Sequence, residues 1–168
     1  MFRSITESRW QAFDAKTGYT IIESALLQNL VTELLFFRCL NEDETITFIN
    51  RLVSYIEPFP AFLIYLSQPD IGKTIRRIAE ERTEKYESGK TWLEIEISRC
   101  ENTPFGKNNN IRDFDGMMKL IAIRKRLEMR IVEQLSIPHV VIDNVDYDWD
   151  FVWSKIESQL YTLTSISP

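Results

Sequence analysis

The triplet Gly72-Lys73-Thr74 matches the end of a phosphate-binding loop of the Walker A type, G-x-x-x-x-G-K-[ST], and it follows a short apolar run. Such a loop holds phosphate oxygens with inward-pointing backbone N–H groups. Here Ser67 replaces the first glycine, Pro69 has no N–H to donate, and Asp70 places a carboxylate where an anion would bind. We therefore interpret the triplet as the first turn of a helix that Asp70 caps. A degenerate phosphate loop is the alternative interpretation.

Polar side chains at the ends of two apolar runs are further candidates for chemistry. Glu23 closes the β-rich stretch YTIIES. It suits either magnesium orientation and proton acceptance beside a phosphate acceptor, or the capping of a helix. Asp143 and Asn144 close a later run, HVVIDN. They suit either contact with a nucleotide base or a turn that leads into a helix.

Basic side chains gather on the segment that follows Asp70. Arg76, Arg77 and Arg82 lie within seven residues of one another. Such a cluster is a possible binding site for an anion. Glutamates are interleaved at helical pairing distance, so a solvated helix surface is the alternative interpretation.

Size and composition indicate one globular domain, residues 1–168, with its own core, since 44% of the residues are hydrophobic and 27% are charged. A net charge of −5 argues against general nucleic-acid binding. The N-terminus, MFRSITESRWQAF, has no apolar signal region, and no run approaches the ~20 residues of a membrane span. Cys39, Cys100 and His139 have no metal-ligand or disulfide spacing. We expect a cytoplasmic protein that has no metal site and does not contact a membrane.

Three short apolar runs, residues 19–24, 61–67 and 139–143, are typical of strands buried on both faces. Helical periodicity fills the intervals, over residues 4–16, 25–40, 43–57, 71 into the 80s, 113–135 and 148–160. Strands separated by helices predict a three-layer α/β/α fold on a mainly parallel sheet. Ligands of such sheets bind beyond the carboxyl ends of the strands, which here are at Glu23, Ser67 and Asp143.

The stretch CENTPFGKNNNIRDFDG, residues 100–116, is polar and contains Pro104, Gly106 and three consecutive asparagines. These residue types are typical of a surface loop. The sequence therefore predicts a loop here, with residues 100–112 mobile.

The order of these segments resembles the C-terminal two thirds of P-loop kinases of the nucleoside and nucleotide kinase type, such as thymidylate kinase and deoxynucleoside kinases. FLIYLSQPD and IGKTIRRIAEER are similar to the strand, turn and lid helix of that family. HVVIDNVDYDWDFVWSKIESQL is similar to its last strand and helix, and YTIIESALLQN to its strand with an acidic end. The resemblance extends over roughly residues 18–162.

This resemblance implies a phosphotransferase that acts on nucleosides or other small molecules, and it is the sole basis for naming ATP and magnesium as cofactors. It assigns roles to six side chains: catalysis to Glu23, the phosphate-clamping lid to Arg76, Arg77 and Arg82, and nucleotide binding to Asp143 and Asn144. In the family, the lid arginines are expected four residues apart, whereas Arg77 and Arg82 are five apart.

The family's first strand, Walker A loop and second strand have no counterpart in the sequence. We therefore expect a truncated P-loop NTPase fold that binds ATP weakly or not at all as this chain stands. The alternatives are a non-catalytic, self-associating or regulatory module derived from a kinase fold, and the product of a longer gene that encodes the Walker A loop upstream.

Apolar side chains surround most of the helix predicted over residues 25–40. A helix of this kind is either deeply buried or shared with a neighbouring chain. The sequence therefore predicts a homodimer, most simply with two-fold symmetry. The alternative is that residues 43–57 and 113–135 cover this helix within one chain.

Overall fold

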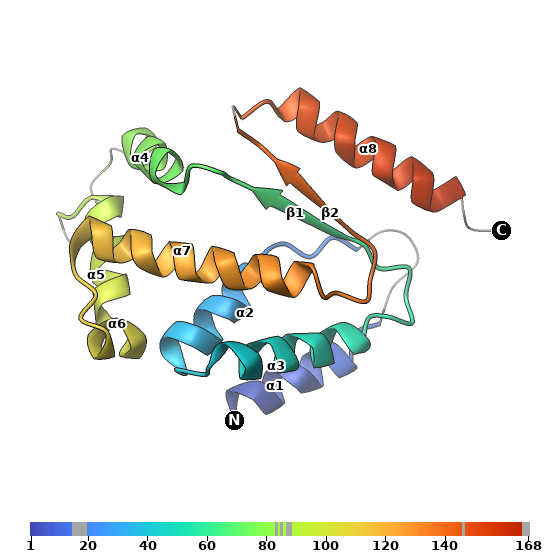
Figure 1. Cartoon of the computed structure of the whole chain (residues 1–168), viewed down its shortest axis with the longest axis horizontal. Coiled ribbons are helices and arrows are strands. Elements are labelled where there is room, and N and C mark those ends of the chain that lie inside the picture. The colour runs from blue at the N-terminus through green and yellow to red at the C-terminus, as the bar shows by residue number, and fades with distance from the viewer. Residues whose placement is uncertain (15–19, 83, 85, 87–88, 146, 166–168) are drawn as a thin grey trace.

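The structure is a computed structural model and describes residues 1–14, 20–82, 84, 86, 89–145 and 147–165. Figure 1 shows a mainly helical molecule in which two short strands lie near α7 and α8. The elements are α1 (Phe2–Gln11), α2 (Gln28–Thr32), the π-helix η1 (Glu33–Phe37), α3 (Glu42–Ser54), β1 (Leu63–Ser67), α4 (Ile71–Glu81), α5 (Trp92–Asn102), α6 (Pro104–Asn108), α7 (Asp113–Val132), β2 (His139–Asp143) and α8 (Trp149–Ser165).

The predicted three-layer α/β/α fold on a mainly parallel sheet is wrong, because helices dominate the described chain and its sheet has only two strands. The strands predicted at residues 61–67 and 139–143 are confirmed as β1 and β2, and they pair in parallel. Leu63 lies opposite His139 and Ser67 lies opposite Asp143. The two carboxyl ends therefore meet at one edge of the sheet.

The third predicted strand, residues 19–24, is wrong where the structure describes it. Residue 19 lies outside the described residues, and residues 20–23 have no regular structure. Ile21 is 92% exposed and Ile22 is 48% exposed. β-rich composition produces a strand only where a neighbouring strand supplies hydrogen bonds and packing, and this segment pairs with neither β1 nor β2.

The core lies where α2, η1, α3 and α7 meet. Leu34 of η1, Leu52 of α3 and Leu127 of α7 are each 0% exposed. The predicted helix over 25–40 becomes α2 followed by a π-helical turn, in which the N–H of Arg38 donates to the carbonyl of Glu33 at 3.0 Å. Its apolar residues are buried within their own chain: Leu26, Leu27, Leu30, Val31, Leu34, Leu35 and Phe36. The alternative, coverage of this segment within one chain, therefore holds, and the segment gives no support to a homodimer.

The predicted loop over residues 100–116 is wrong as well. α5 extends to Asn102, α6 follows at once, and α7 begins at Asp113. Thr103 is only 3% exposed, and its hydroxyl accepts a 2.9 Å hydrogen bond from the N–H of Gly106. Phe105 packs on Phe36 with ring centroids 5.5 Å apart. Thr103 thus caps α6 in a stretch whose polar composition is typical of a loop.

Side-chain caps fix the starts of several described helices, among them the one that the sequence predicts at Asp70. Asn41 and Glu44 form a capping box at the start of α3, with hydrogen bonds of 2.8 and 3.0 Å between their side chains and backbone N–H groups. Asp70 caps α4 through a 2.8 Å hydrogen bond from the N–H of Lys73. In the described part of the chain, no helix is long and apolar enough to cross a membrane.

Candidate functional site

The carboxyl ends of β1 and β2 form the strongest candidate site. The N–H of Asn144 donates to the carbonyl of Ser67 at 3.0 Å, and this hydrogen bond holds the ends of β1 and β2 together. Lys125 of α7 donates from Nζ to the carbonyl of Gln68 at 2.5 Å. We call this region, defined by Ser67, Gln68, Lys125, Asn144 and Tyr147, the strand-end site.

Two side chains of the strand-end site have buried polar atoms without a hydrogen bond. Asn144 is 3% exposed, and its carboxamide oxygen accepts no hydrogen bond in the described structure. The hydroxyl of Tyr147 is also buried and without such a bond. Tyr147 adopts a left-handed backbone with φ of 57°, which is uncommon for a bulky residue. Unmet buried polar groups and unusual backbone angles both concentrate at ligand sites.

Arg77 is the one predicted lid arginine that reaches this site. Its guanidinium carbon lies 3.7 Å from the centroid of the Tyr147 ring, and its Nε donates to Glu81 at 2.7 Å. Arg76 instead lies over Phe114, at 5.3 Å, and Arg82 over Trp92, at 5.2 Å. The three arginines thus contact rings of different elements and do not converge on one point.

The remaining predicted site residues are divided between two regions. Asp143 and Asn144 lie at the carboxyl end of β2, as expected, and Asp143 is exposed. Glu23 is exposed in the irregular segment before α2. No described hydrogen bond or ion pair joins Glu23 to the strand-end site. Gly72-Lys73-Thr74 occupies the first turn of α4, so the interpretation of this triplet as a capped helix start is confirmed.

A buried polar network joins the sheet to α7, and sequence reasoning did not predict it. The hydroxyl of Tyr65 donates to Oε2 of Glu128 at 2.8 Å. Nε of Arg124 lies 3.3 Å from Oε1 of Glu128, an ion-pair distance at which the two atoms do not form a hydrogen bond. Burial raises the pKa of Glu128, and burial next to this carboxylate raises the pKa of Tyr65. The sequence does contain a signal for this buried carboxylate, because Glu128 lies on the apolar face of α7, next to Leu127.

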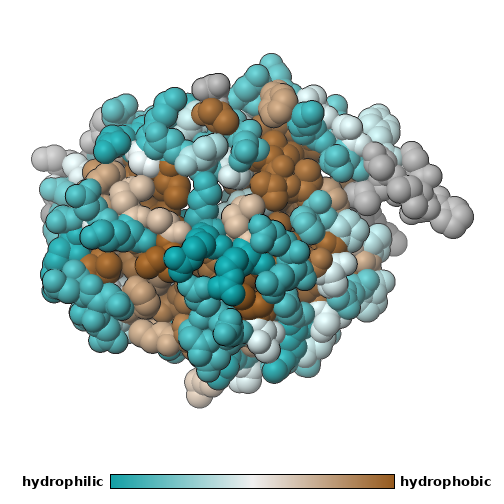
Figure 2. Space-filling model, viewed as in Figure 1, coloured by the Kyte–Doolittle hydropathy of each residue, from teal (hydrophilic) through white to brown (hydrophobic). Residues whose placement is uncertain are grey.

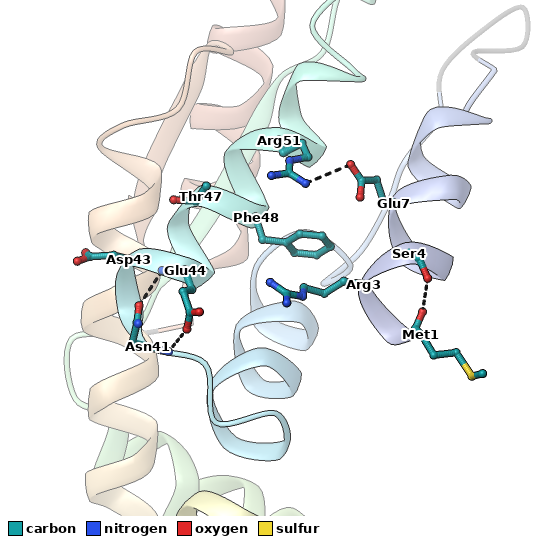
Figure 3. A pocket seen from close by; sticks show the side chains of 10 residues that line it. All are labelled: Met1, Arg3, Ser4, Glu7, Asn41, Asp43, Glu44, Thr47, Phe48 and Arg51. Carbon is teal, nitrogen blue, oxygen red and sulfur yellow. Dashed lines mark hydrogen bonds and ion pairs between the residues drawn. The ribbon is translucent and has the colours of Figure 1, made fainter.

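A groove lies between α1 and α3 and has a volume of about 630 Å³. Figure 3 shows Arg3 and Arg51 extending on either side of the Phe48 ring. Glu7 lies 3.6 Å from Arg51 and accepts a 2.8 Å hydrogen bond from Tyr55, so this carboxylate is already engaged. Asp43 points away from the groove in Figure 3. No sequence motif pointed to this groove.

The described residues contain no group of three His, Cys, Asp or Glu side chains placed to hold a metal ion. Comparisons of the chain with protein-family models, with curated proteins and with solved structures found no match.

Proposed function

We propose that this chain binds a nucleotide or a closely related phosphorylated small molecule at the strand-end site. The observation that carries the proposal is the buried carboxamide oxygen of Asn144, which accepts no hydrogen bond in the described structure. Leaving such an atom unpaired costs about 1–3 kcal/mol. Parallel strands bind ligands beyond their carboxyl ends, and a nucleobase N–H is a donor that suits this oxygen.

Positive charge next to the site supports a phosphorylated ligand. Lys125 uses one donor for the carbonyl of Gln68, and its ammonium group has two further N–H donors. Arg77 lies over the ring of Tyr147, and its side chain remains 46% exposed beside Glu81. A phosphate group can take the place of Glu81 on this guanidinium, since both are oxygen acceptors for its planar fork.

The proposed function includes a relationship to nucleoside and nucleotide kinases. It does not include phosphate transfer by this chain alone. Asp70 and the helical setting of Gly72 oppose the binding of ATP phosphates, so magnesium and ATP enter only through the resemblance. A cytoplasmic location belongs to the same proposal. The free thiols of Cys39 and Cys100 support it, because disulfides are rare in that compartment.

The test measures binding of deoxynucleoside monophosphates to the full chain by calorimetry. Tyr147→Phe removes one hydroxyl while keeping the ring under Arg77, and we expect the affinity to fall by roughly 5- to 10-fold, as for a lost hydrogen bond of about 1–1.5 kcal/mol. Asn144→Leu, which removes the acceptor, is expected to weaken binding further.

Tyr86→Phe is the matched control, because Tyr86 is exposed and lies outside the strand-end site. We expect it to bind as the unaltered chain does. Absence of binding by the unaltered chain at millimolar ligand, or equal affinity for Tyr147→Phe, would overturn the proposal.

A second candidate function is self-association, favoured by the open sheet. With two strands in the described structure, β1 and β2 each have an edge without a neighbouring strand. Figure 2 shows hydrophobic side chains over the strands, between α7 and α8. Leu66 is 42% exposed and Val141 is 38% exposed. Exposed apolar edge strands are sites at which a second copy adds its own strand.

Light scattering after size exclusion tests self-association. A dimer is expected at tens of micromolar protein, and Leu66→Lys is expected to shift it to a monomer because a lysine blocks edge pairing. Thr47→Lys adds the same charge at an exposed position of α3 and should leave the dimer intact. A monomer mass for the unaltered chain excludes this candidate without affecting the nucleotide proposal.

A further inference from the structure

The last helix exposes an unusual amount of aromatic surface. In α8, Trp149 is 52% exposed, Phe151 is 46% exposed and Trp153 is 59% exposed. Val152, which is 1% exposed, and Ile156, which is partly buried, lie on the inner side of the helix. α8 packs mainly on β2, at the margin of the molecule (Figure 1). Tryptophan and tyrosine are enriched in protein interfaces relative to the rest of the surface.

The exposed tryptophans form one stripe. Trp149 and Trp153 are four residues apart, so they neighbour each other on the helix surface. Ile156 is three residues further on and extends the stripe toward the sheet. Phe151 lies on another side of the helix, where Lys155 covers its ring at 5.3 Å. The stripe of Trp149 and Trp153 is therefore separate from the aromatic surface around Phe151.

Carboxylates border the outer side of this stripe. Asp150 precedes Trp153 by three residues and Glu157 follows it by four, so both neighbour its ring on the exposed side. No described arginine, lysine or histidine forms an ion pair with either of them. Lys155, the cation of α8, lies over Phe151 instead. The exposed apolar surface of Trp149 and Trp153 is therefore bordered on one side by the carboxylates of Asp150 and Glu157.

We propose that α8 docks an amphipathic helix of another protein, one whose apolar face is bordered by lysine or arginine. The tryptophan stripe supplies the apolar area on which such a face packs, as one helix packs on another in a coiled-coil pair. Asp150 and Glu157 supply the complementary charge and fix the register of the bound helix. An anionic membrane is disfavoured by the same carboxylates, since amphipathic helices that bind such membranes have basic borders. This inference rests on residues outside the strand-end site.

The test uses two labelled probes, short designed amphipathic helices of the same apolar spacing, one built of Leu and Lys and the other of Leu and Glu. Fluorescence anisotropy with the full chain is expected to show binding of the Leu/Lys helix and not of the Leu/Glu helix. Trp149→Ser with Trp153→Ser should weaken binding by ~10-fold or more, as for loss of central interface aromatics. The control Phe151→Ser should change it by less than ~2-fold, since a residue outside the contact contributes little.

A charge reversal keeps the proposal testable if the tryptophan variant is poorly folded. Asp150→Lys with Glu157→Lys should transfer the preference from the Leu/Lys to the Leu/Glu helix. Glu80→Lys with Glu84→Lys gives the same net charge elsewhere and should retain the original preference. The proposal would be overturned if the charge-reversed variant kept the same preference between the two probe helices as its control. It would also be overturned by a dimer that the tryptophan variant abolishes, or by tryptophan-dependent binding to anionic vesicles.

Discussion

The hydroxyl of Tyr65 donates a 2.8 Å hydrogen bond to Glu128, which joins β1 to α7 across the face of the sheet. Arg124 balances the carboxylate from the other side, at 3.3 Å, and also donates to the hydroxyl of Thr32 in α2 at 3.4 Å. One buried acidic group thus connects a strand and two helices. Removing a single member of such a network leaves the others buried and unpaired.

The first prediction concerns the pH dependence of stability. Burial raises the pKa of Glu128 in the folded state above its ordinary value of 4.5. From that value up to the folded pKa, the folded chain binds more protons than the unfolded chain, so the free energy of unfolding falls as the pH rises. Glu128→Gln removes this contribution. We expect the stability of the variant relative to the unaltered chain to increase with pH above about 4.5, measured by urea unfolding.

Glu133→Gln is the control for this measurement. Glu133 is exposed just after α7, so the variant should follow a pH profile parallel to that of the unaltered chain. A parallel profile for Glu128→Gln as well would show that the buried carboxyl group does not titrate differently in the folded state.

The second prediction separates a helix start from a phosphate loop. Asp70→Ala removes the acceptor for the N–H of Lys73 and should lower the free energy of unfolding by about 0.5–2 kcal/mol. Lys73→Met should leave stability within about 0.5 kcal/mol, since Lys73 is an exposed surface residue. Calorimetry with Mg-ATP should detect no low-micromolar binding to either chain. A phosphate loop would give the opposite pattern, with strong ATP binding that depends on Lys73.

Local signals made individual helices and both described strands predictable, although the predicted three-layer fold was wrong. The cap at Asp70 depends only on residues a few positions apart, and it produced the expected helix start. The capping box of Asn41 and Glu44 starts α3 in the same local way. The runs 61–67 and 139–143 became strands because each had the other as a partner. Residues 20–23 have similar composition but no paired neighbour, so strand formation there depended on distant chain that periodicity does not reveal.

The candidate site was predictable only in part. Asp143 and Asn144 follow from the rule that ligands bind at the carboxyl ends of parallel strands. The approach of Lys125 to Gln68 joins residues 57 positions apart and depends on how α7 crosses the sheet. The arginines after Asp70 were expected to act together, yet Arg76 and Arg82 lie over the rings of Phe114 and Trp92. Such contacts are set by tertiary packing and leave no short motif.

The third prediction tests the tight turn between α5 and α6. A Cβ at Gly106 would lie 2.1 Å from the carbonyl oxygen of Cys100 and 2.8 Å from Oγ1 of Thr103. Neither neighbour can move freely, because the Thr103 hydroxyl caps α6 and also donates a 2.9 Å hydrogen bond to the carbonyl of Cys100. Gly106→Ala should therefore lower the free energy of unfolding by roughly 1–3 kcal/mol, as in other overpacked sites, measured by urea unfolding.

Gly72→Ala is the matched control, since both positions are helical glycines. The nearest atoms to a Cβ at Gly72 belong to the side chains of Arg76 and Asp70, each at 3.4 Å, which is ordinary contact. Alanine there should leave the stability unchanged or raise it by up to about 1 kcal/mol, because it reduces the conformational entropy of the unfolded chain. Equal stabilities for the two alanine variants would mean that α6 can shift away from Cys100 without cost. The stretch 100–116 would then behave as the adaptable loop that its polar composition predicted, despite its helical structure.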